Sequence, residues 1–192
     1  ENTVTAVLPV MHNPTPGNVG LLMRLWSVVL AGNLIGTAVA AWAFNYMPIF
    51  DEPTRQAFVS IAEDVMKNSP TEMFANAIIS GWLVATMVWM FPVAGAAKIV
   101  VIILMTWLIA LADTTHIVVG SVEILYLMFN GNLPWSDFIW PFALPTLAGN
   151  ICGGTFIFAL LSHAQIRNDM SSKRKAEARA QAAEKGKKAD RA

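Results

Sequence analysis

The chain has 192 residues, of which 55% are hydrophobic and 14% are charged, and its 13 basic and 13 acidic side chains give a formal net charge of zero. Three uncharged runs, residues 25–50, 73–97 and 138–166, are each longer than the roughly 20 residues that span a bilayer. Such runs exclude an ordinary soluble protein and indicate an all-α membrane protein.

The first residues form a short apolar segment, which Pro9 interrupts, and a turn-rich loop follows over residues 12–17. A long apolar helix is then predicted from about Val19 to Phe44. Residues 55–66 have an amphipathic pattern with prolines on both sides, so they predict a surface helix and not a further span.

The second part of the chain returns through a span from Met73 to about Pro92 and a tight connection. The next segment is apolar only from Lys98 to Ala112, which is too short for a full crossing. A polar break is predicted over residues 113–120, followed by a second apolar piece over residues 122–129 and a last span from about Trp140 to Leu161.

One pattern occurs twice, as Gly-Asn-Leu-Ile-Gly at residues 32–36 and as Gly-Asn-Ile-Cys-Gly at residues 149–153. The copies are 117 residues apart, which indicates an internal duplication of the kind found in carriers and channels. We expect the glycines to allow close helix contact, and Asn33 and Asn150 to hydrogen-bond the broken segments.

The polar break carries His116, which is expected near the centre of the bilayer, where two half-helices meet. Ionisable groups persist at this depth when they are buried in protein or face a water-filled path. A role in a permeation path is therefore predicted, and a packing histidine satisfied by a backbone carbonyl is the alternative. Asp113 and Thr114 are expected to support the break by bonding the freed backbone groups.

A metal site built from Asp113, His116 and Glu123 is a weaker hypothesis. Asp113 and His116 are three residues apart, a spacing that can place two ligands on one helix face. Two ligands are too few for a typical protein metal site, and the other histidines lie far from the break. We therefore expect no metal and no cofactor.

Nine of the thirteen basic residues lie in the tail between Arg167 and Arg191. Because positively charged segments stay in the cytoplasm, the sequence predicts a membrane domain over residues 1–166 and a basic cytoplasmic tail over residues 167–192. Residues 45–72, where acidic side chains outnumber basic ones, then lie outside. Lys98 falls at an inner helix end, either as a topology marker or as a cation that concentrates anions before His116.

Together these residues resemble the formate/nitrite transporter family, and within it an inner-membrane branch. The resemblance covers residues 1–168 and rests on the two Gly-Asn patterns and on Lys98 eighteen positions before His116. It implies an aquaporin-like fold of six spans in two inverted halves, a homopentamer, and a pore for small monovalent anions in each protomer. It also implies that Lys98 is the inner-vestibule lysine, His116 the central histidine and Ile109 an apolar constriction.

Two positions depart from the relatives that carry formate or nitrite, which commonly have Glu before the histidine and Asn four residues after it. This chain has Thr115 and Gly120 at these pore positions. The half-helix break of the first repeat would fall just before residue 1, so we expect at least about forty further residues in the whole protein. About four and a half of the six spans would then be present here.

The sequence therefore predicts a channel or transporter, and not an enzyme, in a bacterial inner membrane. Small monovalent anions such as formate, nitrite, hydrosulfide or short carboxylates would be attracted by Lys98, pass Ile109 and meet His116. The expected partners are these anions, the lipid bilayer and further copies of the chain, with no nucleic acid. The alternative is a non-transporting envelope protein that keeps the fold.

Overall fold

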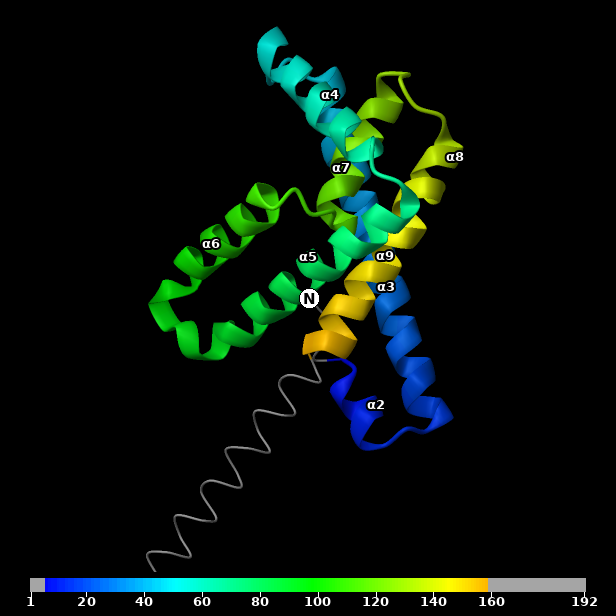
Figure 1. The fold of residues 1–192 in the computed structure, drawn as a ribbon, viewed down its shortest axis with the longest axis vertical. Helices are drawn as coiled ribbons and strands as arrows, with labels where there is room; N and C mark the ends of the chain where they lie inside the picture. The colour runs from blue at the N-terminus through cyan, green and yellow to red at the C-terminus, as the bar shows by residue number, and fades with distance from the viewer. Residues whose placement is uncertain (1–5, 159–192) are drawn as a thin grey trace, which may run out of the picture. The chain divides into compact units, whose positions relative to one another are not determined.

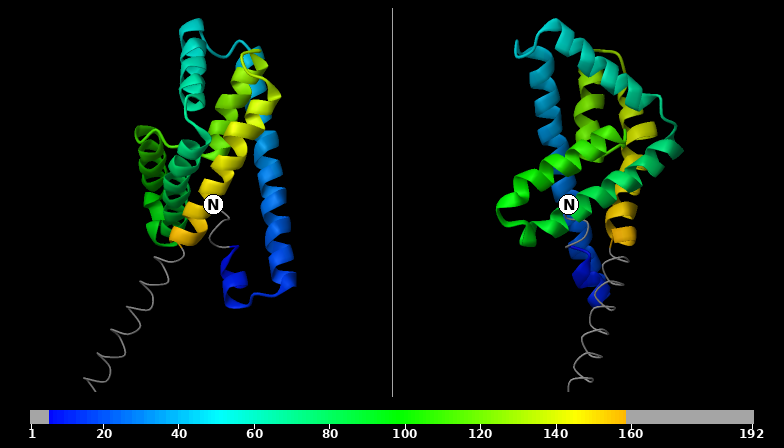
Figure 2. Two further views of the ribbon diagram at one scale, coloured as in Figure 1. Left: turned by 45° about the vertical axis from the view of Figure 1, so that its right-hand side comes forward. Right: turned by 60° about the vertical axis from the view of Figure 1, so that its left-hand side comes forward.

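The structure, a computed structural model, describes residues 6–158, and throughout this range every regular element is a helix. The all-helical fold predicted from the sequence is confirmed. Figures 1 and 2 show α5, Pro70–Ala94, and α6, Lys98–Leu111, folded back on each other as a hairpin. The predicted tail over residues 167–192 lies outside the described residues.

The first elements are α2, Leu8–His12, and α3, Pro16–Tyr46. Thr15 caps α3 by accepting a hydrogen bond from the Asn18 backbone N–H at 3.2 Å, and proline follows at the first helical position, where it needs no hydrogen-bond partner. With 31 residues, α3 is about 46 Å long, enough to cross a bilayer. The predicted long helix is confirmed and extends beyond both predicted ends.

The amphipathic segment forms α4, Glu52–Met66, as predicted. Asp51 caps it by accepting a hydrogen bond from the Thr54 backbone N–H at 3.2 Å. The guanidinium of Arg55 donates to the carbonyl oxygen of Asn45 at 2.7 Å, which ties α4 to the end of α3. α4 then packs against α7, Ile117–Phe129, so this surface helix covers part of the bundle.

The next two helices form the hairpin seen in Figure 1: α5, Pro70–Ala94, a short 3-10 turn, η1, Gly95–Ala97, and α6, Lys98–Leu111. Ser69 and Glu72 form a reciprocal capping box at the start of α5. Gly95 makes the reversal with a φ of +49°, a conformation that glycine adopts without steric cost. The predicted tight connection is confirmed.

Two helical stretches, Pro16–Tyr46 and Pro70–Leu111, are long and apolar enough to cross a membrane. Because the second one reverses at Gly95, it comprises the full helix α5 and the shorter helix α6. α6 packs mainly against α5, and its large apolar side chains are mostly exposed. Such a face fits contact with lipid or with further protein segments.

The chain is interrupted after α6 and resumes with α7, Ile117–Phe129. The predicted break is confirmed, but it covers residues 112–116 and not 113–120. Gly120 lies within α7, where its N–H donates to the carbonyl oxygen of His116 at 2.8 Å. A Cβ at this position would lie 2.7 Å from the Phe142 ring, so the glycine is needed for packing and not for a break.

The last span is a kinked series of α8, Trp135–Asp137, the π-helix η2, Phe138–Ala143, α9, Leu144–Ile151, and the π-helix η3, Cys152–Ile157. It begins five residues before the predicted Trp140, and its predicted end at Leu161 lies outside the described residues. Trp140 has extended backbone angles just before Pro141, which cannot donate the hydrogen bond that would continue the helix.

The core has two parts: α7 packs against α3, α4 and η2, while α5 packs against α9 and η3. The second contact is very close, because a Cβ on Gly149 or Gly153 would overlap the backbone of α5, and one on Gly81 would overlap the backbone at Asn150. The first copy of the repeated pattern differs. Within residues 6–158, a Cβ on Gly32 or Gly36 would meet no atom within 4 Å, so the close contact predicted there is not formed.

Candidate functional site

The break begins where Asp113 adopts a φ of +49° and ends the helical path of α6. The backbone N–H and the hydroxyl of Thr114 both donate to the carbonyl oxygen of Ile109, at 3.2 and 3.0 Å. Thr114 therefore satisfies a carbonyl at the end of α6. The exposed carboxylate of Asp113 has no hydrogen-bond partner within residues 6–158, so the predicted capping by Asp113 is not observed.

Asn150 connects the break to two other helices. Its side-chain oxygen accepts a hydrogen bond from the Ile117 N–H at 2.8 Å. Its amide nitrogen donates to the carbonyl oxygen of Ala77 at 2.8 Å and to the hydroxyl of Ser80 at 3.0 Å. The Asn150 side chain is buried, and its amide and the backbone groups that it bonds would destabilise the fold if they were buried without hydrogen-bond partners. A side chain of α9 therefore fixes the start of α7 against α5.

Ser80 and Thr115 complete this network. The hydroxyl of Ser80 donates to the Thr115 carbonyl oxygen, and the hydroxyl of Thr115 donates to the Met73 carbonyl oxygen at 2.9 Å. Both side chains are buried. Ser80 was not among the predicted site residues, although a serine beside a glycine in an apolar helix is a signal of polar helix packing. Thr115 faces this network and also lines the larger cavity described below.

His116 is the last residue before α7 and has extended backbone angles, with φ −130° and ψ 134°. Its Nδ1 atom is shielded from solvent and has no hydrogen-bond partner in the part of the chain that the structure describes. A buried imidazole nitrogen without a partner is rare in proteins and is a sign of a functional site or of an ordered water. The packing alternative, in which a backbone carbonyl satisfies this ring nitrogen, is not realised within these residues.

Two cavities meet at His116. The α3 cavity has a volume of about 260 Å³ and is lined mainly by α3, α5, α7 and α9, including Asn33 and Asn150. The α4 cavity has a volume of about 790 Å³ and is lined by α4, α6, the break and α7. His116 and Val119 line both cavities. The ring therefore lies between two hollow regions, with apolar side chains forming much of their walls.

Most of the sequence-predicted site residues lie together in the α4 cavity, and they are Ile109, Asp113, Thr114, Thr115, His116 and Gly120. Lys98 is placed elsewhere. It is exposed at the first position of α6 and lines neither of these cavities. Since the break follows the other end of this 14-residue helix, about 20 Å of helix separates Lys98 from the site.

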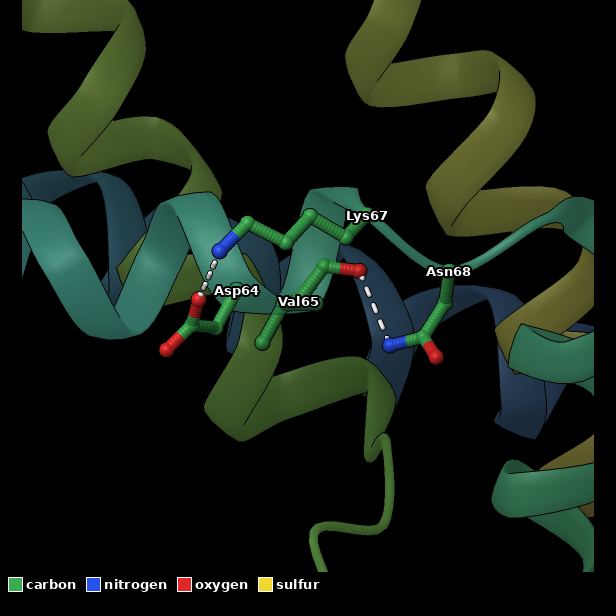
Figure 3. Close-up of polar contacts among 4 residues, drawn as sticks. All are labelled: Asp64, Val65, Lys67 and Asn68. Atoms are coloured by element: carbon green, nitrogen blue, oxygen red, sulfur yellow. Dashed lines mark hydrogen bonds and ion pairs between the residues drawn. The ribbon is translucent and has the colours of Figure 1, made fainter.

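The rim of the α4 cavity is polar where α4 ends (Figure 3). Lys67 forms an ion pair with Asp64, and the amide of Asn68 donates to the carbonyl oxygen of Val65 at 3.1 Å. The hydrogen bond to Asp64 and its charge hold the pKa of Lys67 above its ordinary value. Both charged side chains are largely exposed, so this pair contributes little to stability.

No group of three His, Cys, Asp or Glu side chains within the described range is placed to hold a metal ion. Asp113, His116 and Glu123 all line the α4 cavity, yet they do not converge on a common point. The geometry therefore gives no support to the metal-site hypothesis.

The family model described as Formate/nitrite transporter matches residues 1–164. The chain belongs to this family. It is therefore an all-α membrane protein of a transporter family, as the sequence resemblance indicated. It is 84% identical over 182 residues to "Inner membrane protein YfdC" of Escherichia coli (strain K12), a match that covers 95% of this chain.

The chain spans 59% of the length of that relative. No solved structure matches this chain. The residues that line the two cavities around His116 all lie within the stretch that the family model matches.

Proposed function

We propose that the whole protein carries small monovalent anions across the bacterial inner membrane, with His116 as the central group of the path. The observation that carries this proposal is the position of His116 between two cavities with an unpartnered ring nitrogen. Membership of the formate/nitrite transporter family supports the class of substrate. Formate, nitrite, hydrosulfide and short carboxylates are the candidates.

The imidazole would act as a hydrogen-bond or proton donor to the anion. A charge that loses its water shell in an apolar medium pays several kcal/mol, and protonation of a weak-acid anion removes this cost. Histidine suits the role because each of its ring nitrogens can donate or accept a hydrogen bond. The network of Asn150, Ser80 and Thr115 would hold the backbone on both sides of the ring.

Lys98 would act at a distance from the break. Its position at the start of α6, exposed and about 20 Å of helix away, suits a cation that raises the local anion concentration at the inner entrance. Ile109 is buried and lines the α4 cavity, where it would form part of an apolar constriction. Gly120 and Thr115 would shape the same wall.

The proposed topology places α4 outside and the basic tail in the cytoplasm, following the distribution of lysine and arginine. The α4 cavity would then open toward the outer face. We propose in addition that the protein crosses the membrane several times, assembles as a homopentamer, acts without a cofactor and is not an enzyme.

A non-transporting role in the envelope is the second candidate. The Thr115 hydroxyl donates a hydrogen bond to α5, and Gly120 packs against Phe142. Neither residue is the glutamate or the asparagine that the formate and nitrite carriers commonly have at these two positions. This arrangement fits a protein that keeps the fold of the family but has no functioning anion path.

Anion flux into proteoliposomes that contain the full-length protein separates the two functions. We expect uptake of at least one anion in a panel of formate, nitrite, hydrosulfide and acetate. We also expect a loss of about ten-fold or more in His116→Ala. His12→Ala is the matched control, because His12 is exposed at the end of α2. Equal flux in the two variants would remove His116 from the mechanism, and no flux above empty liposomes would favour the envelope role.

A further inference from the structure

Glu123 is an ionisable residue of α7 that has no role in the anion path proposed above. Its side chain is half-buried, and its carboxylate has no hydrogen-bond or ion-pair partner within residues 6–158. An unpaired carboxylate on a membrane helix is costly unless it faces a hydrated space. Glu123 lines the α4 cavity together with His116, and hydration of this cavity would reduce that cost.

The carboxylate of Glu123 points back along α7 toward the break. One of its oxygens lies 3.9 Å from the point that a Cβ on Gly120 would occupy. His116, which precedes α7, and Gly120 and Glu123 within α7 all line the α4 cavity. The Phe142 ring covers Gly120, so the cavity itself is the space that the carboxylate and the histidine ring share.

The charged groups around Glu123 leave the α4 cavity negative when the carboxylates are ionised. From α4, Asp64 and Lys67 face the cavity as an ion pair and offset each other. From the end of α6, Asp113 adds a further carboxylate, and His116 is the remaining titratable group of the lining. A bare anion would be repelled here, whereas a neutral acid would not.

We propose that Glu123 is the proton donor of the α4 cavity, and that it converts an entering weak-acid anion to its neutral acid before the acid meets His116. The inference rests on the proposed transport function. In this step the O–H bond of the Glu123 carboxylic acid breaks, and a new O–H or S–H bond forms on the anion. A hydronium ion that enters the cavity then returns a proton to the carboxylate and leaves a water molecule, and no electrons are transferred.

This proton transfer limits which anions the protein can carry. A carboxylic acid can protonate the anions of weak acids such as formate, nitrite and hydrosulfide, whose basicity is comparable with its own or greater. It cannot protonate the anion of a strong acid such as nitrate. Glu123 would therefore select weak-acid anions over strong-acid anions of similar size and equal charge.

The test is uptake of radiolabelled formate, and separately of nitrate, by proteoliposomes that contain the full-length protein, with the external pH varied from about 5 to 8. We expect Glu123→Gln to lower formate uptake near neutral pH about ten-fold and to flatten its dependence on external pH. Glu123→Asp keeps a carboxylic acid and should retain the pH dependence. Glu63→Gln is the matched control, because Glu63 is exposed on α4 and does not line the cavity.

Two outcomes overturn the proposal while leaving the transport function intact. One is formate uptake in Glu123→Gln with an unchanged pH profile. The other is a rise in the uptake of both formate and nitrate in this variant, which would show that Glu123 acts only as a repelling charge. If the wild-type protein takes up no anion at all, the transport function itself fails, and the role of Glu123 falls with it.

Discussion

The side-chain oxygen of Asn150 accepts a hydrogen bond from the backbone N–H of Ile117 at 2.8 Å, so a residue of the last span determines where α7 begins. The N-terminal N–H groups of a helix have no partner within the helix, and at a buried residue such as Ile117 no bulk water replaces one. Asn150 supplies this partner and thereby fixes the backbone next to His116, the residue before Ile117.

We expect Asn150→Ala to lower the free energy of unfolding by about 2 to 4 kcal/mol. The Ile117 N–H and the Ala77 carbonyl would lose buried partners, and Ser80 would lose a donor to its hydroxyl. Denaturant unfolding of the full-length protein in detergent measures the change. Asn132→Ala, at an exposed loop position, should cost less than about 0.5 kcal/mol, and similar losses in both variants would contradict this account.

The contact between α5 and α9 predicts a large effect of Gly149→Ala. Its new methyl group would overlap the Phe74 carbonyl oxygen and lie 2.7 Å from the Ala77 Cβ, so the helices would have to separate. We expect a loss of about 1 to 3 kcal/mol in the free energy of unfolding. Gly20→Ala in α3 has no atom within 4 Å of the new methyl group and should be neutral or stabilising by up to about 1 kcal/mol. The reverse order of stabilities would refute the close packing.

Gly120 and Phe142 should be energetically coupled. Gly120→Ala places a methyl group 2.7 Å from the fully buried Phe142 ring, while Phe142→Leu removes the ring edge and leaves space. We expect the double variant to lose less stability than the sum of the single variants, by about 1 kcal/mol or more. A double-mutant cycle on unfolding free energies measures this coupling. Additive losses would mean that the two residues do not meet in the full-length protein.

The cap of α4 predicts a pH effect on stability. Hydrogen bonds from the Thr54 side chain and backbone N–H hold the pKa of Asp51 below its ordinary value of 3.8. Because the folded-state pKa is lowered, the carboxylate stabilises the folded state above pH 3.8, and this contribution is lost as the pH falls through the lowered pKa.

We therefore expect the melting temperature of the wild-type protein to fall more steeply below about pH 4 than that of Asp51→Asn, which keeps a capping oxygen without the charge. Asp51→Ala removes the cap and should lower the melting temperature at every pH. Parallel pH curves for the wild type and Asp51→Asn would show that the carboxylate has no part in this dependence.

Most helix boundaries could be predicted from local sequence. Thr15, Asp51 and Ser69 each place a capping oxygen before a helix that has proline at its first or second position. These signals act within one turn, so they need no tertiary contact. The length of α6 could also be predicted from the sequence, because the apolar run that begins at Lys98 ends at the polar break.

The extent of the break was not predictable in the same way. Gly120 reads as a helix breaker when the sequence is considered alone, yet it continues α7 because the Phe142 ring fills the space beside it. Phe142 is 22 positions away, in a different span. Asp113 likewise has the chemistry of a cap for freed N–H groups, but its side chain is exposed and makes no such bond within residues 6–158, while the Thr114 hydroxyl donates to the freed Ile109 carbonyl.

By itself, the sequence determined the helical membrane fold, the interrupted crossing and the presence of His116 at the interruption, because uncharged runs, caps and breakers act over short stretches of chain. Only the tertiary structure decided which groups surround that histidine. Asn150 and Ser80 bond the backbone on either side of it from other helices, and the Phe142 ring of the last span packs against Gly120 of α7. Those relationships depend on how separate helices pack, and residues brought together by packing carry no signature in their sequence spacing.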